Sequence, residues 1–130
     1  MDAIGALTSA GFFSGVLDPE ALARLAAAAR PVAFGRGAPL MRQGELGASL
    51  FVIAAGKVAV TVHEPGGDRR VARLGPGEVV GEMSLLTGAR RSATVTAEGK
   101  VAAFEITKPA LEPILAASPG LVERFAAMME

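Results

Sequence analysis

The strand pattern is clearest at Val58-Ala59-Val60-Thr61-Val62-His63, which is followed by the turn residues Pro65-Gly66-Gly67-Asp68. Valine at every second position is the alternation of a strand that is buried on one face. The proline, glycines and aspartate then predict a hairpin loop, and residues 71–74 predict the returning strand. Two strands joined by so short a loop run antiparallel.

Short apolar runs separated by glycines extend from this hairpin in both directions. Further strands are predicted at residues 50–53, 94–96 and 101–106. The run at residues 50–53 contains no polar residue, which indicates a strand covered on both faces. Many short strands and tight turns favour a mainly β fold with flanking helices, an antiparallel jelly-roll barrel, over a parallel sheet.

A helical segment is predicted before the strands. Asp18-Pro19-Glu20 combines an N-cap residue, a proline at the first helical position and an acid in the first turn. The helix is expected to run through residues 21–29, with Leu22 and Leu25 on its buried face.

Two helices are predicted after the strands, with Thr107 and Ser118 as their N-cap residues. Pro113 falls inside the first of them, so that helix either starts after Thr107 or bends. The second carries one apolar stripe: Leu121, Val122, Phe125, Met128 and Met129. We therefore expect a single domain over residues 1–130, in three parts: a helical segment at 1–31, a β-roll at 32–106 and C-terminal helices at 107–130.

Composition excludes several classes of function. The 13 Lys and Arg balance the 13 Asp and Glu, so the chain lacks the basic excess that nucleic-acid binding requires. Without Cys there is no disulfide, thiolate metal site or cysteine nucleophile, and the single His63 lacks a second His to form a metal site. The uncharged residues 3–17 are fewer than the roughly 20 that span a membrane, and Asp2 argues against a secretory signal. We expect a soluble, cytoplasmic unit that does not insert into a membrane.

One segment carries the chemistry: Gly81-Glu82-Met83-Ser84-Leu85-Leu86-Thr87-Gly88-Ala89-Arg90-Arg91-Ser92-Ala93-Thr94-Val95. Residues 82–86 predict a short helix whose free N–H groups can bind a phosphate. Arg91, ten positions after Gly81, can fold back and hold two phosphate oxygens with its guanidinium fork. The Glu82 carboxylate can accept from a sugar hydroxyl, and Ser92 adds a hydroxyl of its own. The segment points to a ligand with both ribose and phosphate.

These motifs resemble the phosphate-binding cassette of cyclic nucleotide-binding domains, which occur in cyclic-nucleotide-gated channels, kinase regulatory subunits and bacterial catabolite activators. The cassette is Gly81-Glu82-x-x-Leu85-Leu86 followed by Arg91-Ser92-Ala93-Thr94-Val95. Other segments resemble the same family in the same order: Phe12-Phe13-Ser14-Gly15, Gly37-Ala38-Pro39-Leu40, Gln43-Gly44-Glu45, Gly47-Ala48-Ser49-Leu50-Phe51-Val52-Ile53 and Gly56-Lys57-Val58. The resemblance covers residues 12–130.

The resemblance implies a role for each cassette residue. Glu82 bonds the ribose 2′-hydroxyl and Arg91 pairs with the cyclic phosphate, while the cradle is completed by backbone groups of four residues: Gly81, Met83, Ser84 and Ser92. We expect the base to rest on Val71 and Leu74. Ser92 is compatible with adenine and with guanine, so cAMP is favoured and cGMP stays open.

The resemblance also implies a regulatory binding domain, not an enzyme and without a cofactor or metal, whose C-terminal helices act as a lid and transmit a conformational change. Our first expectation for the host is a larger protein such as an ion channel, because no helix-turn-helix follows Phe125. The sequence departs from the family's pattern in two places. Val80 stands where an aromatic residue is common, and the lid reaches Glu130 without a charged capping residue. A ligand-free interaction module and another jelly-roll small-molecule binder are the alternatives. The sequence leaves the base preference, the output, the oligomeric state and any capping residue beyond Glu130 open.

Overall fold

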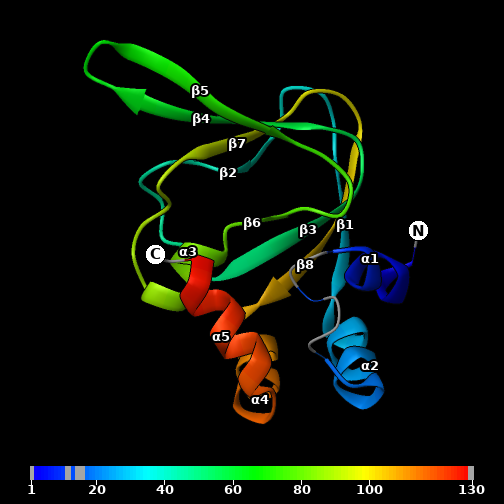
Figure 1. Cartoon of the computed structure of the whole chain (residues 1–130). Coiled ribbons are helices and arrows are strands. Elements are labelled where there is room, and N and C mark those ends of the chain that lie inside the picture. The colour runs from blue at the N-terminus through cyan, green and yellow to red at the C-terminus, as the bar shows by residue number, and fades with distance from the viewer. Residues whose placement is uncertain (1, 11–12, 14–16, 129–130) are drawn as a thin grey trace.

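An antiparallel β-roll forms the centre of the computed structural model, which describes residues 2–10, 13 and 17–128 (Figure 1). The strands within these residues are β1 (Arg30–Phe34), β2 (Pro39–Met41), β3 (Ser49–Ala55), β4 (Val58–Glu64), β5 (Gly67–Leu74), β6 (Val79–Val80), β7 (Thr94–Ala97) and β8 (Val101–Thr107). They form two four-stranded sheets, in the orders β1-β8-β3-β6 and β2-β7-β4-β5. We call the first the helix-covered sheet and the second the open-faced sheet.

The predicted antiparallel, mainly β fold is confirmed, with one correction. The strands form two sheets and do not close into a barrel. All of the strands predicted from the sequence are present, as β3, β4, β5, β7 and β8. The pattern missed β1, β2 and β6, which have five, three and two residues and are too short for their periodicity to stand out.

The helices are α1 (Ala3–Ser9), α2 (Pro19–Ala28), α3 (Glu82–Thr87), α4 (Lys108–Ala117) and α5 (Pro119–Met128). The predicted cap of α2 is confirmed, since Asp18 Oδ1 accepts from the Ala21 N–H at 2.7 Å. Thr107 caps α4, and the helix continues through Pro113. No helix in the described ranges is long and apolar enough to cross a membrane. Phe12, Ser14, Gly15 and Met129 lie outside the described residues, as do the side chains of Phe125 and Met128.

Two hydrophobic clusters lie on opposite faces of the helix-covered sheet. Leu50 and Val52 on β3 pack in the cluster shared with the helices, whereas Phe51 and Ile53 pack in the cluster between the two sheets. Residues 49–54 of β3 are therefore all buried, which confirms the predicted two-sided strand. Figure 1 shows α1, α2, α4 and α5 on one side of this sheet and the open-faced sheet on the other.

Candidate functional site

The site is organised by the turn that leads from β6 into α3. Gly81 has φ 87° and lies in the left-handed region, which glycine adopts without the steric cost of a Cβ. A Cβ at this position would also lie 2.5 Å from Arg91 Nη1. The short helix predicted over residues 82–86 is confirmed as α3, which ends at Thr87 and is followed by Gly88, another left-handed glycine.

Arg91 holds this turn against the start of β3. Its side chain is almost fully buried, with the residue 6% exposed. Nη1 donates to the Gly81 carbonyl oxygen at 3.0 Å, and Nη2 donates to the Ser49 carbonyl oxygen at 2.8 Å. The Arg91 backbone N–H donates to the Glu45 carbonyl oxygen at 2.7 Å. The prediction that the chain folds Arg91 back onto Gly81 is confirmed by a direct hydrogen bond.

Opposite charges share this partly dehydrated region. Burial lowers the pKa of the Arg91 guanidinium, while the charges of Glu45, Glu105 and Glu82 act in the opposite direction. Burial raises the pKa of the Glu82 carboxyl, and a backbone hydrogen bond and the Arg91 charge oppose that rise. Electrostatic interactions are stronger in such surroundings than in water, so an added anion would respond to each of these groups.

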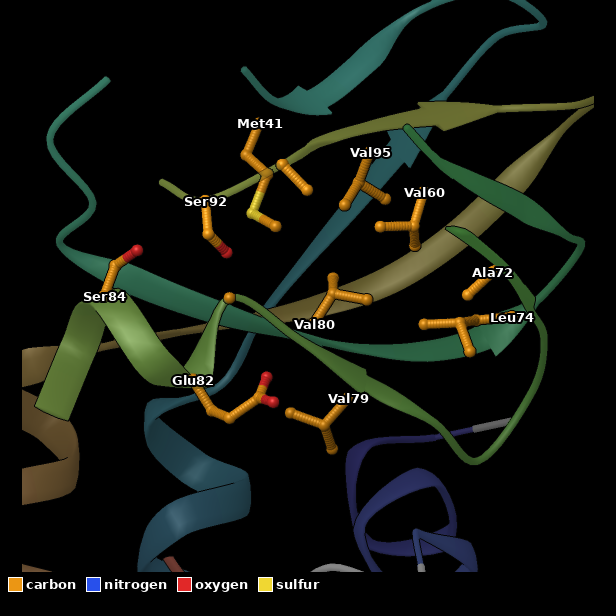
Figure 2. Close-up of a pocket in the computed structure, with 12 residues that line it drawn as sticks. Met41, Val60, Ala72, Leu74, Val79, Val80, Glu82, Ser84, Ser92 and Val95 are labelled. Carbon is orange, nitrogen blue, oxygen red and sulfur yellow. The ribbon is translucent and has the colours of Figure 1, made fainter. Parts of the chain in front are cut away.

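A cavity of about 200 Å³ lies beside α3, between the inner face of the open-faced sheet and β6 (Figure 2). Figure 2 shows the Ser84 and Ser92 side chains at one end and Ala72 and Leu74 at the other. Its lining is mostly apolar and consists of Met41, Val60, Ala72, Leu74, Val79, Val80, Gly81, Glu82, Ser84, Ser92, Ala93 and Val95. The cavity is thus polar at the α3 end and apolar at the strand end, and we call it the α3 cavity.

Most of the residues predicted from the cassette converge here. Four of them line the α3 cavity, namely Gly81, Glu82, Ser84 and Ser92, and so does Leu74, which was expected to support the base. Arg91 contacts the cavity wall through the Gly81 carbonyl and itself lines a separate hollow together with Glu45, Ser49 and Glu105. Met83 lies in α3, and nothing is described of its side chain.

The expected position of Val71 is wrong. Val71 is 43% exposed and is not among the residues that line the α3 cavity. The cause is the alternation of β5: Leu74 and Ala72 face inward opposite Val58 and Val60, so Val71 faces outward. A register shift between Val60 and Thr61 also leaves Val71 without a direct partner in the ladder.

Sequence reasoning missed the remaining apolar lining and the carboxylates around Arg91. The alternation of β4 already pointed to Val60 as an inward residue, and Val95 has the same signal in β7. Glu45 and Glu105 carried no such signal, because they approach Arg91 only through the tertiary fold. Within the described residues no group of three His, Cys, Asp or Glu side chains is placed to hold a metal ion.

This chain belongs to the cyclic nucleotide-binding domain family. The family's sequence profile, described as Cyclic nucleotide-binding domain, matches residues 31–118, which contain α3 and all of the β-roll except Arg30 at the start of β1. The resemblance read from the cassette motifs is therefore confirmed.

Relatives of known identity come from several kinds of protein. The chain is 32% identical over 120 residues to a CRP-like cAMP-activated global transcriptional regulator of Mycobacterium tuberculosis, covering 92% of this chain and 53% of that protein. It is 33% identical over 109 residues to a cyclic nucleotide-gated potassium channel of Mesorhizobium japonicum, covering 84% of this chain and 29% of the channel. The crystal structure of the Thermus thermophilus Catabolite Activator Protein matches with a TM-score of 0.82 and 32% identity, covering 91% of this chain and 55% of that one. The chain thus spans about half the length of the regulators that it matches.

Proposed function

We propose that this domain binds cAMP in the α3 cavity, with the cyclic phosphate at the Ser84–Ser92 end and the adenine at the apolar end. The observation that carries the proposal is the hydrogen bond from Arg91 to the carbonyl oxygen of Gly81, because it joins a buried cation to a residue that lines the polar end of a mostly apolar cavity. A site that pairs an apolar surface with a few placed polar groups is typical of small-molecule binding.

Each cassette residue has a role in this proposal. Glu82 lines the cavity and accepts from the ribose 2′-hydroxyl, while Arg91 and Ser92 interact with the phosphate. The cradle is completed by the backbone groups of Gly81, Met83, Ser84 and Ser92. The base rests on Leu74 together with Ala72 and Val60, which replace Val71 as its neighbours. Since the cavity is smaller than the 300 Å³ or more of a usual ligand pocket, part of the nucleotide lies outside it.

The signal passes from α3 to the C-terminal helices. Leu85, on α3, is buried in the same hydrophobic cluster as Leu111 and Ile114 of α4 and Leu121 of α5. Packed side chains of this kind have discrete arrangements, so a ligand that moves α3 shifts the preferred packing of α4 and α5. We infer a regulatory domain that acts by conformational change and has no catalytic activity of its own.

We infer that the host is a larger cytoplasmic regulator, in which this domain is the sensor. The 32% identity to a transcriptional regulator over 92% of the chain favours a regulator of transcription, so a nucleic-acid partner would be contacted by other parts of the host. The second candidate is a channel, favoured by the 33% identity to a cyclic nucleotide-gated potassium channel.

Isothermal titration of the chain with cAMP, cGMP and 5′-AMP tests the proposal. Arg91→Ala removes charge-assisted contacts worth about 1.5–3 kcal/mol each, so cAMP affinity should fall at least about tenfold. Arg91→Lys keeps the charge but loses the guanidinium fork, so its cAMP affinity should lie between those of the natural chain and of Arg91→Ala. The matched control is Arg90→Ala: Arg90 is adjacent and exposed, donates to the Gly44 carbonyl oxygen, and should leave affinity within about twofold.

Thermal unfolding of each variant separates a lost contact from a lost fold. Binding that is unchanged in a folded Arg91→Ala variant contradicts the proposed site. Equal affinity for cGMP contradicts the base preference alone. An absence of heat with every nucleotide would instead support the ligand-free interaction module.

A further inference from the structure

A chain of polar contacts extends from Arg91 to the opposite edge of the helix-covered sheet. Arg91 Nη2 donates to the Ser49 carbonyl oxygen, and the Ser49 hydroxyl donates to Glu105 Oε2, each at 2.8 Å. The other carboxylate oxygen, Glu105 Oε1, accepts from Arg30 Nη2. Arg30 and Glu105 are also direct partners in the register of β1 and β8. One ion pair is therefore connected to the cassette arginine through a single residue.

Glu105 does not line the α3 cavity, so it is not placed to contact a ligand bound there. It lines the separate hollow that it shares with Arg91, Ser49 and Glu45. Its side chain is only 18% exposed, whereas that of Arg30 is 73% exposed. The mostly buried Glu105 carboxylate is thus poorly screened toward Arg91, while its partner Arg30 is largely solvated.

The charge of Glu105 acts on Arg91. The Glu105 carboxylate is one of the three negative charges that stabilise the protonated guanidinium and raise its pKa against the effect of burial, together with Glu45 and Glu82. A counter-charge close to a cation weakens the field that the cation exerts on an incoming anion. Because Arg91 is already held by the carbonyl oxygens of Gly81 and Ser49, it does not depend on Glu105 to stay in place.

We propose that the Arg30–Glu105 ion pair tunes the affinity of the domain for its anionic ligand, because the Glu105 carboxylate balances the charge of Arg91 from outside the cavity. The inference rests on the proposed binding of a cyclic nucleotide phosphate beside Arg91. Glu105 lowers the affinity for the anion, and Arg30 partly offsets Glu105. The two members of the pair therefore act with opposite signs.

Titration of the chain with cAMP tests whether Glu105 and Arg30 change the affinity in opposite directions. Glu105→Gln removes the charge but keeps an oxygen that accepts from Ser49, and it should tighten binding about fivefold. Arg30→Gln leaves the Glu105 charge without its partner and should weaken binding about twofold, the smaller effect because Arg30 is exposed. The matched control is the hairpin pair of Glu64 and Arg69, joined at 2.7 Å, where Glu64→Gln and Arg69→Gln should leave affinity unchanged.

Ionic strength provides a readout that a purely structural role would not move. Raising the salt from about 0.15 M to about 1 M shortens the Debye length from about 8 Å to about 3 Å. The weaker binding of Arg30→Gln should therefore move toward that of the natural chain, because Arg30 is exposed, whereas the tighter binding of Glu105→Gln should persist, because Glu105 is mostly buried. Melting temperatures establish that each variant is folded.

The outcomes separate this inference from the proposed function. If the natural chain binds cAMP and Arg91→Ala abolishes binding, but Glu105→Gln and Arg30→Gln bind as the natural chain does or both bind more weakly, the inference is overturned and the function stands. If the natural chain binds no cyclic nucleotide, both fall.

Discussion

The two sheets of the roll differ in how many of their faces are covered. In the helix-covered sheet, residues 49–54 of β3 are buried between the helices on one face and the second sheet on the other. In the open-faced sheet, residues 67–71 of β5 are exposed. Hydrophobic burial, the main stabilising contribution to folding, is therefore concentrated in the first sheet.

This difference between the sheets indicates that different residues determine the stability of the domain and its ligand binding. The α3 cavity takes most of its apolar lining from the inner face of the open-faced sheet, whereas Arg91 is held by the start of β3 in the helix-covered sheet. Substitutions in the helix-facing core should thus lower stability, and substitutions around Arg91 should lower binding while the fold survives.

The largest effect is expected from truncation in the helix-covered sheet. Leu50 on β3 is fully buried, and Leu50→Ala should lower the free energy of unfolding by about 2–5 kcal/mol through lost burial and a cavity. Val71→Ala, on the exposed part of β5, should change it by about 0.5 kcal/mol or less. Urea denaturation of both variants measures the contrast. Equal losses would show that the two sheets contribute equally to stability.

A smaller effect, on binding and not on folding, is expected at Gly47. An alanine Cβ there would lie 2.4 Å from Arg91 Cζ and Nε, so the guanidinium must move. Because only the far end of a flexible side chain is displaced, the fold should persist, while cAMP affinity should fall about tenfold. The matched control is Gly35→Ala, since a Cβ at Gly35 would meet no atom within 4 Å. Titration and thermal melting would contradict this if Gly47→Ala unfolds the chain or leaves affinity unchanged.

The same contrast explains which features the sequence could reveal. Local signals were sufficient for β4, through its alternating valines, for α2, through the Asp18 cap, and for α3 with its flanking Gly81, because each depends on residues close in the chain. The return of Arg91 to Gly81 also followed from spacing within one loop.

Features that depend on pairing between distant segments could not be read in this way. Arg30 and Glu105 are neighbours only because β1 pairs with β8, 75 positions away. Val71 was misplaced because an expected apolar surface does not specify which face of β5 a residue occupies, and the register shift opposite it is not visible in the sequence. The burial of Arg91 depends on carbonyl groups of β3 and β6–α3, which no side-chain pattern encodes.

A still smaller effect, on how stability depends on pH, is expected at Glu82, the first residue of α3, which follows β6 of one sheet and precedes β7 of the other. Burial raises the pKa of this carboxyl in the folded chain, so the folded state retains a proton that the unfolded state has lost. Stability from this group therefore falls as pH rises through the pKa of the unfolded state toward that of the folded state. Glu82→Gln removes this dependence.

Urea denaturation of the natural chain and of Glu82→Gln from about pH 4 to pH 7 measures the pH dependence that comes from Glu82. The other carboxylates titrate in both proteins, so their contribution cancels in the difference between the two. The free energy of unfolding of Glu82→Gln, relative to that of the natural chain, should increase across this range. A difference that is constant or decreases with pH would show that burial does not dominate at Glu82.

The smallest effect is expected at the far end of the open-faced sheet, in the β4–β5 hairpin. His63 Nδ1 lies 2.6 Å from Asp68 Oδ1, but the two side chains are 77% and 66% exposed. An ion pair this solvated contributes a median of about 0–1 kcal/mol, so Asp68→Asn should change the free energy of unfolding by less than about 1 kcal/mol and leave cAMP affinity unchanged. Denaturation at pH 6 in low and high salt checks the first expectation, and titration checks the second. A larger loss of stability would mean that the hairpin contributes to the cooperatively folded core. The difference in stability between the two sheets would then not apply to the β4–β5 hairpin.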